Sequence, residues 1–204
     1  YPLRRQRQMC IRDRKNIKRY TPLFFLSILL FSFSCNKKDK EDDNESTFSK
    51  TELLANLGDN IILPGYNNLK LNVEDFEAKH NAFINEKTAV NFDSLKSSWK
   101  RTYLQWNKVS IFNFGPAVDF GLQAALGTFP TDSSKILSNI SSGSYNLSSS
   151  ANIDAIGIPA FDFLLYRYNA FEEYSNNVNY SDYALALITK MKGEVNAVYN
   201  LWNT

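Results

Sequence analysis

Apolar side chains recur every three or four residues over most of the chain that follows residue 49. The clearest run advances by 3, 4, 3, 4 and 3 residues and comprises Tyr66, Leu69, Val73, Phe76, His80 and Phe83. Residues at this spacing share one face of an α-helix, and such a face is typical of the seam between packed helices. No segment sustains the alternation of a strand, so the pattern predicts an all-α helical bundle.

The first two helices are expected between Ser49 and about residue 109. Ser49 suits an N-cap before Thr51–Asn60, and Pro64 is expected to kink or break this helix before the run from Tyr66 resumes. The first segment would carry Leu54, Leu57 and Ile61 on one face. The second helix is expected from about Phe92, with an inward face of Leu95, Trp99, Thr102, Tyr103, Trp106 and Val109.

Two more helices are expected after a serine-rich stretch. Thr131–Asn152 has nine serines among residues 133–150 and is too long for an ordinary bundle loop, so it is expected to hold short helical turns or the rim of a site. A helix starting near Gly157-Ile158-Pro159 would turn Phe161, Leu164, Leu165 and Tyr168 inward. A last helix capped by Ser181 would bury Ala184, Leu187, Ile188, Met191, Val195, Val198 and Trp202.

The amino-acid composition excludes several kinds of metal and disulfide site, and it says less about the fold. The 204 residues include one histidine and two cysteines, which excludes a zinc ribbon, a disulfide scaffold and a multi-histidine metal cage within them. Residues 36–204 hold 20 acidic and 15 basic side chains, a net charge of −5. This mildly acidic body gives no reason to expect a nucleic-acid partner.

Both ends of the chain look unlike natural termini. Residues 1–14 begin with Tyr1 and have no apolar periodicity, so they are expected to be a non-native leader; a natural basic extension is the alternative. At the other end, Leu201–Thr204 stops within a helical pattern without a C-cap. The domain at 49–204 is therefore expected to be truncated at its C-terminus.

An export signal is expected at residues 15–35. Lys15, Lys18 and Arg19 precede the apolar segment Pro22–Ser34, which is short for a membrane span but suits the core of a signal peptide. Ser32-Phe33-Ser34-Cys35 resembles a bacterial lipobox, in which Cys35 would be lipidated; a buried cysteine is the alternative. The charged residues 36–48 would form a solvated tether. We therefore expect a lipid-anchored protein of the bacterial cell envelope, at the outer membrane on its periplasmic or surface face.

Three segments in the body resemble one family. They are Trp99 to Trp106 with the turn Phe112-Asn113-Phe114-Gly115-Pro116, then Leu126-Gly127-Thr128-Phe129-Pro130-Thr131-Asp132, and then Gly157-Ile158-Pro159-Ala160-Phe161-Asp162 with the apolar residues up to Tyr166. In this order they are similar to the imelysin-like proteins, or peptidase M75 family. The resemblance covers about Leu53 to Thr204. It implies an all-α fold of two related helical bundles, of which this chain is the first, with a site between them.

The chain departs from the family at its G-x-H-x-x-E motif. The matching positions are Gly157, Pro159 and Asp162, so the histidine is replaced by a residue without a ligand atom and the glutamate by a shorter acid. A glutamate that the family often has before the aromatic turn corresponds to Ser110. The pair that could hold a transition metal or activate water is therefore absent from this segment.

Four aspartates remain as candidates for a weaker cation site. Carboxylates suit Ca²⁺ or Fe³⁺ better than zinc, so such a site is expected near Asp162 and Gly157, with Asp119 or Asp132. Asp154 and these residues are equally ordinary as helix caps and loop residues. His80 lies on an apolar stripe and is expected to be a hydrogen-bonded structural histidine, not a metal ligand or base. Trp99, Tyr103 and Trp106 are expected to pack in the core, with pocket lining as the alternative.

The resemblance implies a role in metal or iron acquisition. The favoured hypothesis is a non-catalytic envelope lipoprotein that acts as a binding or accessory component beside an envelope metal-uptake partner. One alternative is an M75-type metallopeptidase whose metal ligands lie in a further half of the protein. Another is a helical glycan-binding lipoprotein of a nutrient-uptake system, although no internal repeat is seen in the sequence.

Overall fold

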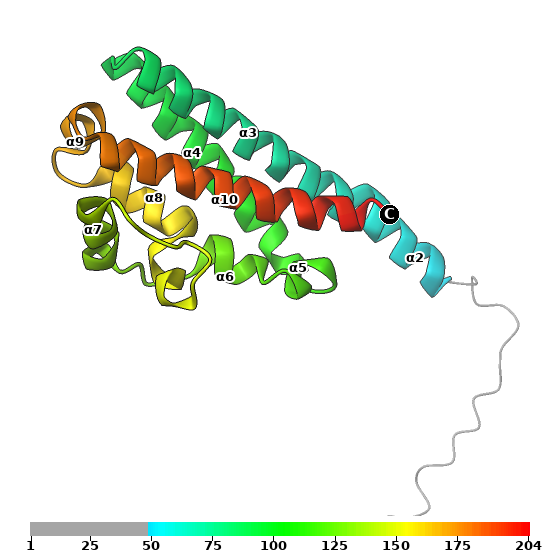
Figure 1. Ribbon diagram of the computed structural model, residues 1–204. Coiled ribbons are helices and arrows are strands. Elements are labelled where there is room, and N and C mark those ends of the chain that lie inside the picture. The colour runs from blue at the N-terminus through cyan, green and yellow to red at the C-terminus, as the bar shows by residue number, and fades with distance from the viewer. Residues whose placement is uncertain (1–48) are drawn as a thin grey trace, which may run out of the picture. The chain divides into compact units, whose positions relative to one another are not determined.

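Three long helices frame the part of the chain that the computed structural model describes, residues 49–204. They are α3 (Leu63–Asn85), α4 (Ala89–Val109) and α10 (Val178–Trp202), and α3 packs along both of the others (Figure 1). Residues 49–204 contain no strand. The prediction of an all-α bundle is therefore confirmed.

Shorter elements complete the described region. The segment before α3 consists of α2 (Lys50–Leu57) and a π-helical turn (Gly58–Ile62). Between α4 and α10 lie a 3₁₀ turn (Ser110–Phe112), α5 (Pro116–Asp119), α6 (Leu122–Gly127), α7 (Ser133–Ser142), a second 3₁₀ turn (Ser150–Ala155), α8 (Gly157–Tyr166) and α9 (Ala170–Asn176). In Figure 1 these short helices lie against one side of the long-helix frame.

The core follows the apolar stripes of the long helices. Every residue of the 3-4-3-4-3 run on α3 is buried, from Tyr66 to Phe83. On α4 the expected residues Leu95, Trp99 and Trp106 are buried. The buried positions on α10 include Ala184, Leu187, Ile188, Met191, Val195 and Val198. Periodicity therefore identified most of the surfaces by which these helices pack.

Pro64 was expected to kink or break the helix, and the helix is not broken there. Ser49 caps α2 as expected, accepting a bond from the Glu52 amide at 3.2 Å. The chain then stays helical through the π turn, and Pro64 lies at the start of α3, where a missing amide hydrogen is tolerated. The π turn before Pro64 is itself a type of irregularity at which helices bend, so the helix is irregular next to the proline without ending there.

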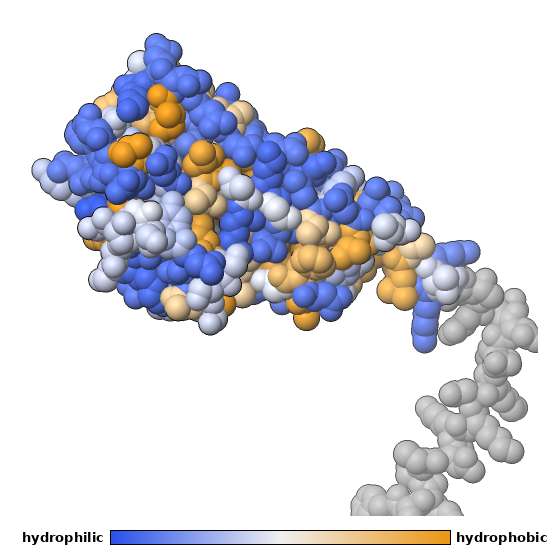
Figure 2. All heavy atoms as spheres, in the orientation of Figure 1, coloured by the Kyte–Doolittle hydropathy of each residue, from blue (hydrophilic) through white to orange (hydrophobic). Residues whose placement is uncertain are grey.

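Residues of α2 are exposed instead of packed. No residue of α2 is buried, and Leu54 is 65% exposed, while Ile61 in the π turn is 51% exposed. Figure 2 shows apolar residues, coloured orange, at the end of the molecule where Figure 1 places α2 and α5. The apolar face expected on the first helix is therefore largely a surface feature.

Two aromatic residues and one cap also differ from the sequence prediction. Tyr168, expected inward, is 88% exposed, because α8 ends at Tyr166 and Arg167 is extended (φ −64°, ψ 161°). Tyr103 is half exposed at the edge of the α4 stripe. Ser181 is not the cap of α10, since that helix starts at Val178 after Asn177.

The serine-rich stretch contains a full helix. Asp132 caps the N-terminus of α7, Gly143 ends it in the left-handed conformation (φ 62°), and Ile136 and Ile140 are buried four residues apart. These are ordinary start and stop signals. The stretch was expected to hold short helical turns or the rim of a site, and it holds a ten-residue helix with one buried edge.

Several predictions fall outside the described residues. The leader 1–14, the signal peptide 15–35 with Cys35, and the tether 36–48 all lie there. Within residues 49–204, no helix is both long enough and apolar enough to cross a membrane.

Candidate functional site

The segment that carries the family-like motif forms the start of α8. Gly157, its first residue, has φ +79°, a conformation that L side chains rarely adopt. A Cβ atom there would lie 2.6 Å from the Leu126 carbonyl oxygen at the end of α6. Glycine is therefore required both by the backbone angle and by the close approach of α6 to α8.

Three aromatic side chains hold the backbone around α8. The Trp99 Nε1–H of α4 donates to the Ile158 carbonyl oxygen at 3.2 Å, inside the motif segment. The Tyr183 and Tyr180 hydroxyls of α10 donate to the carbonyl oxygens of Ala155 (2.6 Å) and Leu164 (2.8 Å). Burial raises the pKa of Tyr183 to about 12 and that of Tyr180 even higher, so both stay protonated donors at neutral pH. These bonds fix α8 between α4 and α10.

The two altered motif positions lie on the first turns of α8. Pro159 is half-buried and contributes no donor or acceptor from its side chain, whereas Asp162 is exposed. Tyr166, one turn after Asp162, has its ring 5.3 Å from that of Trp99. Burial, followed by the charges of Asp162 and Asp93, raises the pKa of the Tyr166 hydroxyl. The negative charges of both carboxylates therefore disfavour deprotonation of the Tyr166 hydroxyl.

These residues do not fit a transition-metal site. Among residues 49–204, no three or more His, Cys, Asp or Glu side chains are grouped where they could hold a metal ion. At the motif itself, Pro159 offers no ligand atom and Asp162 offers one carboxylate. A catalytic zinc site takes three protein ligands, so the motif segment cannot supply one alone.

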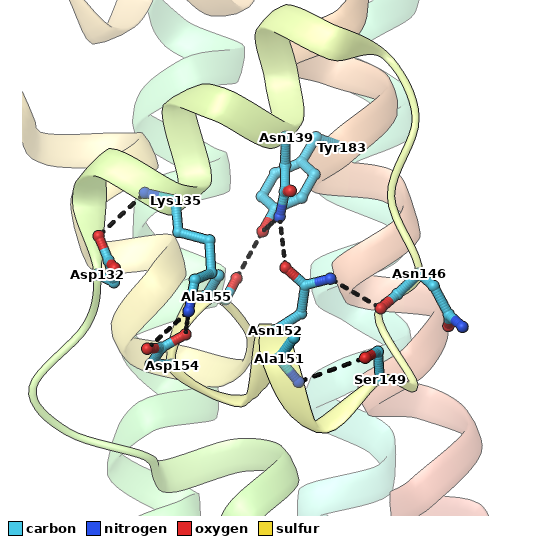
Figure 3. Close-up of polar contacts among 10 residues, drawn as sticks. All are labelled: Asp132, Lys135, Asn139, Asn146, Ser149, Ala151, Asn152, Asp154, Ala155 and Tyr183. Atoms are coloured by element: carbon cyan, nitrogen blue, oxygen red, sulfur yellow. Dashed lines mark hydrogen bonds and ion pairs between the residues drawn. The ribbon is translucent and has the colours of Figure 1, made fainter.

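The other candidate aspartates have structural contacts. Asp132 accepts a bond from the Lys135 amide at 2.9 Å as the cap of α7, and Asp154 pairs with the Lys135 ammonium at 2.7 and 2.9 Å (Figure 3). The Lys135 side chain, through its hydrogen bond, lowers the pKa of Asp154. Asp119 is exposed at the end of α5. The proposed cation residues Asp119, Asp132 and Asp162 thus belong to three different elements.

Polar contacts also fix the serine-rich segment after α7. Asn139 donates to the Asn152 side-chain oxygen at 2.9 Å, and Asn152 donates to the Asn146 carbonyl oxygen at 2.8 Å. Figure 3 shows these side chains meeting beside Tyr183 of α10. The segment is therefore tied to α7 and α10 by its asparagines, while its serines mainly form local turns.

His80 is buried as expected but is only partly hydrogen-bonded. Its exposed fraction is 2%, its Nδ1 lies 3.4 Å from the Asn81 side-chain oxygen, and its ring meets Tyr174 edge-on at 5.7 Å. Nε2 is buried and has no hydrogen-bond partner within residues 49–204. Burial is the main influence on the His80 pKa and lowers it. The imidazole is therefore a packed, neutral ring.

The contacts that Trp99 and Tyr166 make at α8 were not predicted from the sequence. Trp99 was expected in the core, where it is, but its bond to the Ile158 carbonyl needs the packing of α4 on α8 to be known. A signal for Tyr166 was available, because it follows Asp162 by four residues and so shares its helix face.

The region that contains α8 is similar in sequence to known proteins. The sequence model described as imelysin, Peptidase_M75, matches residues 62–204. Iron-regulated protein A of Synechococcus elongatus is 26% identical over 74 residues, which are 36% of this chain and 21% of that protein. The similarity thus spans about a fifth of that relative's length. No solved structure matches the chain.

Proposed function

Since the chain belongs to the imelysin, or peptidase M75, family, we propose that it is a non-catalytic lipoprotein of the bacterial envelope that serves iron acquisition. Its role there is that of a binding or accessory component beside a metal-uptake partner.

The link to iron rests on family membership and on one relative. The similar protein of Synechococcus elongatus carries the name iron-regulated protein A. Production that responds to iron is a common property of proteins that take up or handle this metal. We extend that association from the relative to this chain.

The observation that carries the non-catalytic role is Pro159 at the start of α8. The family motif would place a histidine there and a glutamate one turn later. Pro159 has no side-chain nitrogen or oxygen, and Asp162 extends one methylene less. Trp99 and Gly157 still shape this turn through packing and a backbone hydrogen bond. The helix start is thus kept as a structural element without the metal-binding pair.

The anchor rests on the sequence around Cys35. A basic segment, an apolar segment, Ser-Phe-Ser-Cys and a charged stretch follow one another in the order of a bacterial lipoprotein signal. Several acyl chains hold a protein on a membrane far more firmly than one chain does. Lipidation at Cys35 would leave residues 36–48 to separate the helical region from the membrane.

The test is uptake of radioactive iron by the bacterium that encodes the chain. Under iron limitation, a deletion strain should accumulate less iron than the parent, and the wild-type gene should restore uptake. Cys35→Ala should fail to incorporate acyl label and should fail to restore uptake. Unchanged uptake in the deletion strain contradicts the iron role, and continued acylation of Cys35→Ala contradicts the anchor.

A further inference from the structure

A row of aromatic side chains runs along the outer side of the α4–α8 contact. On α4, Phe92, Lys96, Trp99 and Tyr103 are three or four residues apart and share a face. The Trp99 and Tyr103 rings are stacked, with centroids 5.7 Å apart and planes within 4° of each other. The Tyr166 ring of α8 also lies against Trp99, with centroids 5.3 Å apart and planes tilted by 58°. We call Trp99, Tyr103 and Tyr166 the aromatic platform.

The platform reaches the surface although its middle is packed. Tyr103 is 42% exposed and Tyr166 is 51% exposed, while Trp99 between them is 9% exposed. Trp99 is held by the buried bond from its Nε1–H to the Ile158 carbonyl oxygen. Two partly exposed tyrosines thus lie against a tryptophan whose orientation is held by a hydrogen bond.

A cavity of about 320 Å³ adjoins the platform at Tyr166. Its charged and aromatic lining includes Phe92, Asp93, Lys96, Tyr166, Arg167 and Glu172. The Lys96 ammonium lies 4.5 Å from the Phe92 ring centroid and 5.3 Å from that of Tyr166. The two acidic and two basic side chains of this lining balance one another, so the cavity has no net charge to attract an anion or a cation.

This combination suits an uncharged sugar. A pyranose ring presents C–H groups on a face, which stack on aromatic rings, and hydroxyl groups around its edge, which need both donors and acceptors. Lys96 and Arg167 are donors, Asp93 and Glu172 are acceptors, and the tyrosine hydroxyls are both. Asp162, one turn before Tyr166, adds an acceptor beside the platform. A strongly charged ligand would instead need one sign of charge in excess.

We propose that the aromatic platform and the adjoining cavity bind a neutral oligosaccharide. Tyr103 stacks on a sugar ring, and the cavity beside Tyr166, whose ring lies under the Lys96 ammonium, receives the hydroxyl-bearing edge of the neighbouring sugar. This binding function is separate from the iron role and needs no metal. Asp162 and Tyr166 would then be ligand-binding residues of α8, the helix in which the family's metal-binding pair is missing.

The experiment titrates the full 204-residue chain with neutral hexasaccharides of glucose, xylose and mannose. Calorimetry and tryptophan fluorescence report binding, in a detergent without a sugar headgroup. At least one hexasaccharide should bind saturably, and Tyr166→Ala and Tyr103→Ala should each weaken it at least tenfold. Tyr166→Phe should retain more affinity than Tyr166→Ala, since it keeps the ring.

Tyr168→Ala is the matched control, because Tyr168 is an exposed tyrosine two residues from Tyr166 and lies outside the platform. This variant should bind as the wild type does, and circular dichroism should confirm that all variants remain helical. Binding of none of the hexasaccharides overturns the proposal. So does affinity that falls equally in Tyr168→Ala, and so does a preference for charged oligosaccharides over neutral ones.

Discussion

At the scale of single residues, Gly157 is the position that tolerates least change. Its backbone is in a glycine-favouring conformation, and the Leu126 carbonyl oxygen occupies the space of a Cβ atom. We expect Gly157→Ala to lower the free energy of unfolding by at least about 2 kcal/mol, because backbone strain and a clash with rigid backbone add up. Urea denaturation followed by circular dichroism measures this change.

A second glycine provides the matched control for that variant. Gly193 lies inside α10, and a Cβ atom there would meet nothing within 4 Å. Gly193→Ala should raise the free energy of unfolding by about 0.5–1 kcal/mol, since alanine favours helix. Equal stability of the two alanine variants would show that α6 and α8 do not approach each other as described.

Because His80 is buried, the free energy of unfolding is expected to depend on pH. Burial lowers its pKa in the folded state, so the unfolded chain takes up the proton more readily. The stability contributed by the neutral ring is therefore full above the unfolded pKa of about 6.5 and is lost as pH falls below it. Because His80 is the chain's one histidine, its ring proton resonances can be titrated without ambiguity by NMR.

The matching variant is His80→Gln, which stays neutral at every pH. Between about pH 7 and pH 5, its free energy of unfolding should fall less steeply than that of the wild type. A His80 pKa at or above the ordinary value in the NMR titration would contradict the buried, neutral ring.

At the scale of elements, Phe161 joins α8 to the long-helix frame. It is fully buried, and its ring meets Phe76 of α3 edge-on at 4.7 Å. Phe161→Ala should cost about 3–5 kcal/mol of stability through lost contacts and the cavity left behind. Tyr168→Ala, at an exposed site just beyond α8, should change stability by less than about 0.5 kcal/mol. Chemical denaturation of both variants measures the difference, and a similar loss in both would contradict the packing of α8.

Sequence periodicity predicted the long elements well and the short ones poorly. The stripes of α3 and α10 extend over many turns, so their buried faces are evident before any packing is known. By contrast, α5, α6 and α9 have four to seven residues, too few to show a period. Tyr168 was misplaced because the helix stops two residues before it, and that end depends on an extended Arg167 that no strong local signal marks.

At the scale of the whole molecule, the sequence predicted the family and the altered motif, whereas the surroundings of the motif required the structure. Gly157, Pro159 and Asp162 could be assigned to motif positions from the resemblance of their segment to the family. That Trp99 donates to this segment, and that Asp119, Asp132 and Asp162 sit on separate elements, follows only from how α4, α5, α7 and α8 pack. Long-range packing of this kind leaves no mark on local sequence.

The start of α8 is held by close packing and a hydrogen bond from Trp99, and its altered motif positions offer one carboxylate to a metal ion. Calorimetric titration of the full chain with Zn²⁺, and in parallel with Ca²⁺ and Fe³⁺, tests this most directly. We predict no tight stoichiometric binding of zinc, and at most weak binding of the harder cations that decreases in Asp162→Asn. Tight binding of one zinc ion per chain that disappears in Asp162→Asn would contradict this and would favour a metallopeptidase.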